Sequence, residues 1–150
     1  ASPDGDNRAA LHRQITAAEV PVGLVALAGQ HPVGWTRVAP RSQLPGVLSN
    51  RALRRILADD PGAWWVTCFV VDARYRGHGV GQALLTGAVS HARNHGASAV
   101  EGHPVDVDRL AAPKVGGSAL FTGTLAMFVN AGFTEIGRTF PSRPVMRLRL

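Results

Sequence analysis

Apolar positions follow two different periods in the middle of this chain of 150 residues. An almost unbroken apolar run over residues 64–71 predicts a central strand that is covered on both faces. Gly96 is suited to the C-cap of a helix after this strand, and residues 97–104 predict a second strand. This strand, helix and strand together predict a parallel, right-handed crossover. The expected helix has an apolar stripe that consists of Leu84, Leu85, Ala88, Val89 and Ala92.

The flanking segments predict shorter elements. On the N-terminal side we expect a helix that starts at Asp6 or Asn7, a hairpin of strands at 21–28 and 32–38, and one short helix capped by Ser49 or Asn50. On the C-terminal side we expect a loop over 105–117, a helix capped by Thr122 that ends at Gly132, and an antiparallel pair at 134–140 and 144–150, with Arg147 and Arg149 facing outward.

Composition indicates one globular domain over residues 1–150, with a flexible start at 1–6. Hydrophobic residues make up 45% of the chain, which is enough for a core of ordinary size. Cys68 is the only cysteine, and the chain has neither a secretory leader nor an apolar run long enough to span a membrane. We therefore expect a cytoplasmic protein that does not bind membranes.

The net charge of +6 comes almost wholly from arginine, whose planar fork suits phosphate and carboxylate oxygens. The arginines are scattered along the chain and are not interleaved with aromatic residues. Many nucleic-acid-binding surfaces, in contrast, combine clustered basic residues with aromatic ones. The scattered pattern favours a solvated surface over a nucleic-acid partner, although a basic nucleic-acid-binding domain is a rival interpretation.

A glycine-rich turn follows the central strand and leads into the helix. Gly77, Gly79 and Gly81 allow the backbone to turn sharply and leave amide groups free where the helix dipole begins, as in an anion-binding cradle. The spacing fits neither a Rossmann turn, because Gln82 occupies the last glycine slot, nor a P-loop, which needs Gly-Lys-Ser or Gly-Lys-Thr.

The pattern Arg76-x-x-Gly79-x-Gly81 after a hydrophobic strand resembles the acyl-CoA signature of the Gcn5-related N-acetyltransferase (GNAT) superfamily. The segment 125–133 also resembles a later element of that superfamily, and the order of elements agrees over residues 20–150. The resemblance implies an α/β (α+β) fold with a mixed, mostly antiparallel sheet, flanking helices and splayed central strands. The first strand of the family is missing here.

The resemblance implies acetyl-CoA as co-substrate and no metal. The pantetheine arm would pair with the central strand at Phe69, Val70 and Val71, where one amide would stabilise the oxyanion. Arg76 would pair with a phosphate, and the pyrophosphate would lie on the amides of Gly77, His78, Gly79, Val80, Gly81 and Gln82.

A general base is needed to deprotonate the attacking amine. Glu101 is the first candidate, because several members of the superfamily place a catalytic Glu on the corresponding strand; a salt-bridged Glu is the alternative. His103 is the second candidate, since it shares a face with Glu101 and imidazole titrates near neutral pH. The usual general acid of the family, a tyrosine, is replaced here by Phe128, which cannot donate a proton. His91 and His95 have a spacing that could hold a metal, although the helix dipole explains them more simply.

These observations predict an N-acetyltransferase that transfers the acetyl group of acetyl-CoA to a primary amine by direct attack in a ternary complex. The acceptor is a small molecule or a protein amine, and a homodimer is a possible assembly. A non-catalytic acyl-CoA-binding or regulatory module is the alternative, prompted by Phe128 and the missing first strand.

Overall fold

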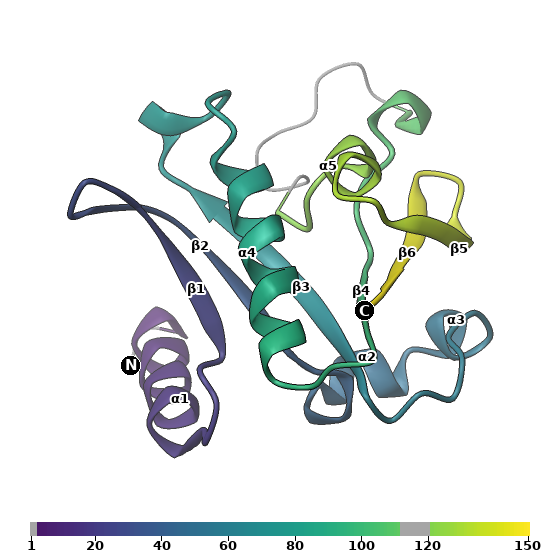
Figure 1. Cartoon of the computed structure of the whole chain (residues 1–150), viewed down its shortest axis with the longest axis horizontal. Helices are drawn as coiled ribbons and strands as arrows, with labels where there is room; N and C mark the ends of the chain where they lie inside the picture. The colour runs from purple at the N-terminus through teal and green to yellow at the C-terminus, as the bar shows by residue number, and fades with distance from the viewer. Residues whose placement is uncertain (1–2, 112–120) are drawn as a thin grey trace.

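The computed structural model describes residues 3–111 and 121–150, with side chains from residue 8 onward. Its centre is a six-stranded sheet in the order β1-β2-β3-β4-β6-β5 (Figure 1). The strands are β1 (Gly23–Ala28), β2 (His31–Pro40), β3 (Ala63–Val71), β4 (Ala99–Gly102), β5 (Thr134–Phe140) and β6 (Arg143–Arg149). Only β3 and β4 pair in parallel, so the sheet is mixed and mostly antiparallel, as predicted.

Helices flank this sheet. The helix α4 lies across β1, β2 and β3, whereas α1 lies beside the edge strand β1 (Figure 1). None of the described helices is both long and apolar enough to cross a membrane. The helices are α1 (Pro3–Ala17), α2 (Pro45–Ser49), α3 (Arg51–Arg54), α4 (Val80–Asn94) and α5 (Leu125–Asn130), with short 3-10 turns at Arg41–Gln43, Ala73–Tyr75 and Val107–Arg109.

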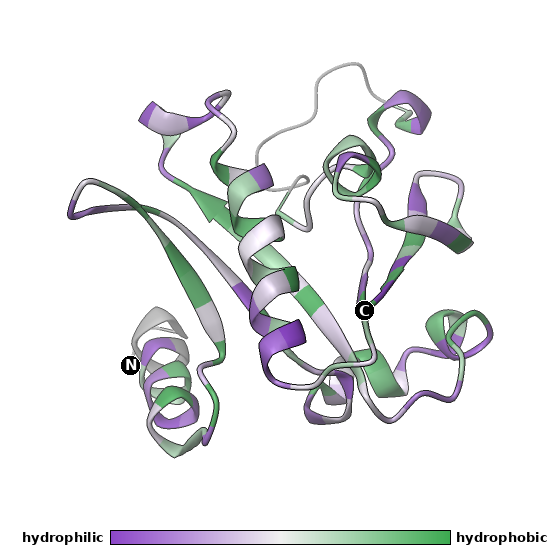
Figure 2. Cartoon of the chain, in the orientation of Figure 1, coloured by the Kyte–Doolittle hydropathy of each residue, from purple (hydrophilic) through white to green (hydrophobic). Residues whose placement is uncertain are grey.

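The core has one part on each face of the sheet. The larger part lies between the sheet and α4, and every residue of the predicted α4 stripe is buried in it. The smaller part lies on the opposite face, where Trp65 packs with Leu44 and Leu53. The green colour of β3 in Figure 2 reflects its apolar sequence, which is covered on both faces along the first half of the strand.

A β-bulge in β3 marks the point where β3 and β4 stop pairing. Arg37 of β2 pairs with Cys68, but the next residue, Val38, pairs with Val66, so Thr67 is the extra residue on β3. The last pair between β3 and β4 is Val66 with Gly102. The two strands therefore separate at the bulge, directly after Val66, which confirms the splayed central strands.

Several sequence expectations need correction. The helix α5 begins later than predicted, because Thr124, not Thr122, caps it by accepting a hydrogen bond from Met127 N. The single short helix expected near Asn50 is joined by α2, although Asn50 does cap α3. Arg149 is exposed to solvent, as predicted, but Arg147 is partly buried and forms ion pairs with Asp60 and Glu101.

Among the described residues no strand precedes β1. That the first strand of the family is missing stays a prediction. Part of the expected loop at 105–117 lies outside the described residues. The single domain, the homodimer and the cytoplasmic location stay predictions.

Candidate functional site

The glycine turn forms an open backbone cradle at the start of α4. Gly77 and Gly79 have φ values of 76° and 79°, a region that side chains other than glycine rarely adopt. The first hydrogen bond of α4 runs from Ala83 N to Gly79 O at 3.0 Å. The N–H groups of residues 80–82 therefore have no partner within the helix and lie at its positive end, where an anion is stabilised.

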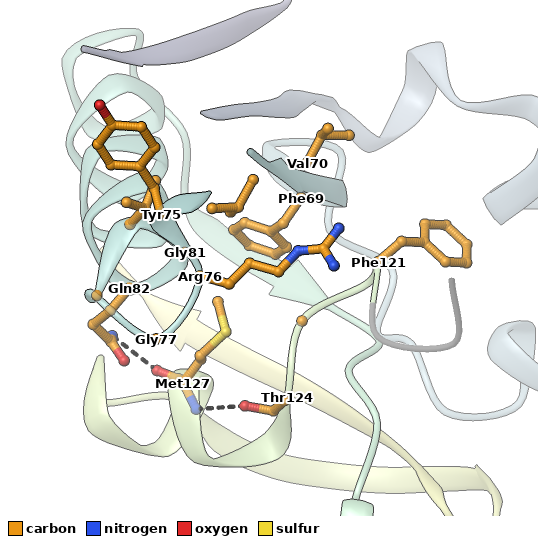
Figure 3. Close-up of a pocket in the computed structure, with 14 residues that line it drawn as sticks. Phe69, Val70, Tyr75, Arg76, Gly77, Gly81, Gln82, Phe121, Thr124 and Met127 are labelled. Atoms are coloured by element: carbon orange, nitrogen blue, oxygen red, sulfur yellow. Dashed lines mark hydrogen bonds between the residues drawn. The ribbon is translucent and has the colours of Figure 1, made fainter. Parts of the chain in front are cut away.

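Contacts on both sides hold this turn in place. The Asp72 carboxylate accepts a hydrogen bond from Arg74 N at 3.0 Å, and the Arg74 guanidinium lowers the pKa of Asp72 to about 2. At the other end, the Gln82 side chain donates to Met127 O at 3.0 Å, which ties α4 to α5 (Figure 3).

A cavity of about 550 Å³ lies between this turn, the end of β3 and α5. In Figure 3 the Arg76 side chain extends across the cavity in the direction of Phe121. Nine of the ten residues predicted to bind the cofactor line the cavity; His78 does not, and its exposed ring bonds Arg76 O at 2.9 Å. The other nine are Phe69, Val70, Val71, Arg76, Gly77, Gly79, Val80, Gly81 and Gln82.

The backbone of β3 presents amides to the gap at every second residue. Phe69 N donates to Phe121 O at 2.5 Å on the gap side, whereas Asp72 N donates to Val33 O on the β2 side. By alternation along the strand, the N–H of Val71 faces the gap and that of Val70 faces β2. The N–H of Val70 is therefore not directed into the gap.

Glu101 lies in a buried ion network on the face of the sheet opposite α4. Its side chain is 0% exposed, and its two oxygens bind Arg41 at 2.7 Å and Arg147 at 2.5 Å. Arg147 also binds Asp60, whose pKa is lowered by hydrogen bonds from Ser98 and Arg147. Both carboxylate oxygens of Glu101 are thus engaged by guanidinium groups, which favours the salt-bridged alternative. Its catalytic role stays a prediction.

His103 lies beyond the end of β4 and is partly buried. Its Nε2 is 2.6 Å from Thr139 Oγ1, and its ring is 6.5 Å from that of Trp65, edge to face. Burial, and secondarily the positive charge of Arg143, lowers the pKa of His103 to about 4. The imidazole is therefore neutral at pH 7, with a proton on one ring nitrogen and a lone pair on the other.

His103 lines a second cavity of about 640 Å³ on the face opposite α4. Thr67, the bulge residue, lies in its wall, and Phe121 lines both this cavity and the first one. The gap between β3 and β4 thus has a cavity on either side. Arg37 and Arg143 also line the second cavity; sequence reasoning missed both, because no local pattern distinguishes them from surface arginines.

Phe128 is a core residue and is 0% exposed. Its ring packs edge to face on Phe69 and Phe133, at centroid distances of 6.4 and 4.9 Å. A Cβ atom at Gly102 would overlap with this ring, so Gly102 is needed to admit it. Phe128, at the position that corresponds to the tyrosine of the family, is thus part of the core between the sheet and α4.

The described residues contain no cluster of three or more potential metal ligands. The rings of His91 and His95 lie 4.4 Å apart, tilted by 53°, and both bond carbonyl oxygens: His91 bonds Pro21 O and His95 bonds His91 O. These contacts agree with a structural role at the end of α4.

Several solved structures share this fold. A ribosomal-protein-alanine N-acetyltransferase from Brucella melitensis is 19% identical, with a TM-score of 0.60 over 97% of this chain and 78% of its own. A protein from Salmonella typhimurium, solved with its cofactor acetyl-CoA, is also 19% identical, with a TM-score of 0.60 over 100% of this chain and 76% of its own. An N-acetyltransferase from Staphylococcus aureus is 15% identical, with a TM-score of 0.60 over 96% and 76%.

The sequence comparison agrees with the fold. No curated protein matches the chain. The family described as the acetyltransferase (GNAT) family matches residues 2–114, which include β3, the glycine turn, α4 and β4. The chain therefore belongs to the GNAT family of acetyltransferases.

Proposed function

We propose that this protein transfers the acetyl group of acetyl-CoA to a primary amine by direct attack in a ternary complex. The observation that carries the proposal is the pair of cavities on either side of the gap between β3 and β4, which share Phe121 as a common wall. Two substrates entering from opposite faces would meet at this gap. Holding them there turns a bimolecular reaction into an effectively unimolecular one.

The residues of the first cavity fit a CoA thioester. The free amides at the start of α4 suit a pyrophosphate, and Arg76 supplies a guanidinium in the same cavity. The apolar walls and the gap-side backbone of β3 suit an extended pantetheine arm. The bound co-substrate supplies the activated acetyl group. The N–H of Phe69 supports the proposal as a hydrogen-bond donor to the thioester carbonyl. One such donor is worth roughly 3 kcal/mol in oxyanion sites of other enzymes.

For the proton of the amine we propose His103 as the acceptor, directly or through water. It lies in the second cavity and is neutral at pH 7. The Thr139 hydroxyl also lies 3.5 Å from Arg143 O, so it can donate there while it accepts Nε2–H, which leaves the lone pair on Nδ1. We propose that Glu101 acts as a positioning residue, because its ion pairs join β4 to β6 and to Arg41.

The alternative is a module that binds acyl-CoA without turnover. Phe128 supports it, because this ring has no proton to give to the leaving thiolate and is sealed in the core. The pKa of a free thiol is about 8.5, so a thiolate leaves without much assistance. A general acid at this position is therefore not essential. We therefore favour the enzyme.

Two measurements on the same protein test the proposal. Acetyl-CoA should raise the melting temperature by mass action, and the protein should release CoA thiol when acetyl-CoA and a suitable amine are present together. A melting shift without thiol release across a broad amine panel would support the binding module. No shift at millimolar acetyl-CoA, in a folded sample, would reject both.

A further inference from the structure

Two of the buried and partly buried arginines differ from the others in their ion-pair partners. The arginines that are not exposed to solvent are Arg37, Arg41, Arg138, Arg143 and Arg147. Three of these bind carboxylates at 2.5–2.7 Å: Arg41 binds Glu101, Arg138 binds Asp106 and Glu135, and Arg147 binds Glu101 and Asp60. Pairing of this kind is expected, because a charge removed from water without a partner is costly.

Arg37 and Arg143 depart from this rule. The Nε atom of Arg37 is buried and has no hydrogen-bond partner among the described residues. Arg143 donates only to the neutral hydroxyl of Thr122, at 3.0 Å, and burial lowers the pKa of its guanidinium. Neither arginine forms an ion pair within the part of the chain that the structure describes.

Both arginines line the second cavity, together with His103. No Asp or Glu is among the described residues that line it, and the sequence of residues 112–120 contains neither. Among the residues whose side chains the structure describes, the cavity therefore has two guanidinium groups and no acidic side chain to balance them. Buried polar groups without partners commonly bind a ligand, an ion or water.

We propose that the acceptor is a small primary amine that also bears an anionic oxygen group, carboxylate or phosphate, and that Arg37 and Arg143 bind this group. This inference rests on the proposed acetyl transfer and names its substrate class. A guanidinium binds such oxygens through short, charge-assisted hydrogen bonds. Amines with several positive charges and no anion, such as polyamines and aminoglycosides, are disfavoured by the same two arginines.

The position of His103 agrees with this substrate class. The charge of Arg143 helps to keep the His103 pKa near 4, where the imidazole is a weak base. An anion bound to Arg143 offsets that charge and moves the pKa of His103 upward. A correct acceptor would then strengthen the base that deprotonates it, whereas a neutral amine would not.

The test compares matched amines in the thiol-release assay. Each α-amino acid is paired with its α-amide and its decarboxylated amine, and phosphoethanolamine is paired with ethanolamine. We expect the anionic member of at least one pair to have the higher kcat/KM, by about 10- to 100-fold for one or two charge-assisted hydrogen bonds. The amino acid and phosphate arms identify which anion is bound. Equal or higher kcat/KM for the members without an anionic group, in all pairs, would overturn the inference while leaving acetyl transfer intact.

Variants connect this preference to the two arginines. Arg37→Gln and Arg143→Gln should raise KM for the anionic acceptor and remove most of the preference, with KM for acetyl-CoA unchanged. Arg149→Gln is the matched control, because it removes the same charge from an exposed position on β6. A preference that survives in both variants would reject the assignment to these residues. Arg37→Lys and Arg143→Lys serve in place of a glutamine variant that fails to fold, and each should weaken the preference because lysine lacks the fork.

A binding readout separates this inference from turnover. The imidazole pKa of His103, followed by NMR, should rise with the N-acetyl amino acid product that bears a free carboxylate and stay constant with its neutral amide. This result would support the anion site even if no acceptor were turned over. An unchanged His103 pKa with both products, at concentrations that saturate binding, would contradict it.

Discussion

The backbone N–H of Phe69 donates a hydrogen bond of 2.5 Å to the carbonyl oxygen of Phe121, across the gap between β3 and β4. A carbonyl oxygen thus accepts from the amide that we propose as the oxyanion donor. A thioester carbonyl can use this amide only if it replaces Phe121 O.

This relationship predicts a difference between two ligands. The amide resonance of Phe69 should shift more with acetyl-CoA than with CoA, because only acetyl-CoA has the thioester carbonyl. The amide of Val71, which faces the same gap, should respond similarly to both ligands. A titration followed by ¹⁵N–¹H NMR measures both signals at once. Identical shifts of Phe69 with the two ligands would mean that another group receives the thioester oxygen.

The glycine turn offers a test with an internal control. Gly79 and Gly96 lie at opposite ends of α4, both with positive φ (79° and 76°) and with open space where a Cβ would lie. Valine at either position should cost about 1–2 kcal/mol of stability through backbone strain. Only Gly79→Val should also weaken CoA, by about tenfold or more, which corresponds to the loss of one charge-assisted hydrogen bond. Calorimetric titration beside a thermal melt measures both effects; equal CoA affinity in the two variants would place the phosphates elsewhere.

The ion network predicts that Glu101 is a stability residue. Glu101→Gln leaves two guanidinium groups near a neutral amide, so we expect a loss of about 3–5 kcal/mol in the free energy of unfolding. Glu135→Gln, which weakens an exposed pair with Arg138, should cost at most about 1 kcal/mol. Denaturant unfolding measures both. If Glu101→Gln instead keeps its stability and loses about 10²- to 10⁴-fold in kcat, Glu101 is the base.

Local periodicity was sufficient to predict the elements that line the first cavity. The strand β3, the parallel crossover and the buried stripe of α4 each depend on neighbouring residues, whose spacing directly reflects burial. The error at the start of α5 has a local cause as well. Both Thr122 and Thr124 are good capping residues, and the sequence alone does not distinguish them.

The second cavity and the ion network near it depend on contacts that are distant in sequence. Glu101 meets Arg41 and Arg147 across 60 and 46 residues, so no short pattern predicted that Arg147 would be turned inward. The bulge at Thr67 shifts the register between β2 and β3, and strict alternation along the strand does not anticipate it. Arg37 was not identified as a cavity residue, because no local pattern distinguishes it from a surface arginine.

The packing of Phe128 predicts that restoring the tyrosine of the family does not restore an acid. The ring is fully buried, and its far end lies against Gly102 of β4. In Phe128→Tyr the added hydroxyl overpacks the core, at a cost of about 1–3 kcal/mol, and kcat should not rise. Phe140→Tyr, at a ring that is 67% exposed, should change stability by no more than about 0.5 kcal/mol. A stable Phe128→Tyr enzyme with faster turnover would show that this position does reach the leaving group.

The environment of His103 predicts a pH dependence of stability with a definite sign. Its pKa is about 4 in the folded protein, because burial and the charge of Arg143 disfavour the imidazolium, against about 6.5 in an unfolded chain. Between these values the unfolded chain binds more protons than the folded one. The folded state therefore loses stability as the pH falls from about 6.5 to about 4, and it has the full contribution above 6.5.

His103→Gln removes this titration and keeps a polar side chain near Thr139. The variant should thus lose less stability than the wild type over the same pH range, as measured by urea unfolding at several pH values in one buffer series. NMR titration of the folded wild type should give a His103 midpoint near 4. A midpoint near 6.5, with parallel stability curves for the two proteins, would show that the imidazole is hydrated and free to ionise. The proposed base would then act at its ordinary pKa, and its activation by an anionic acceptor would have no role.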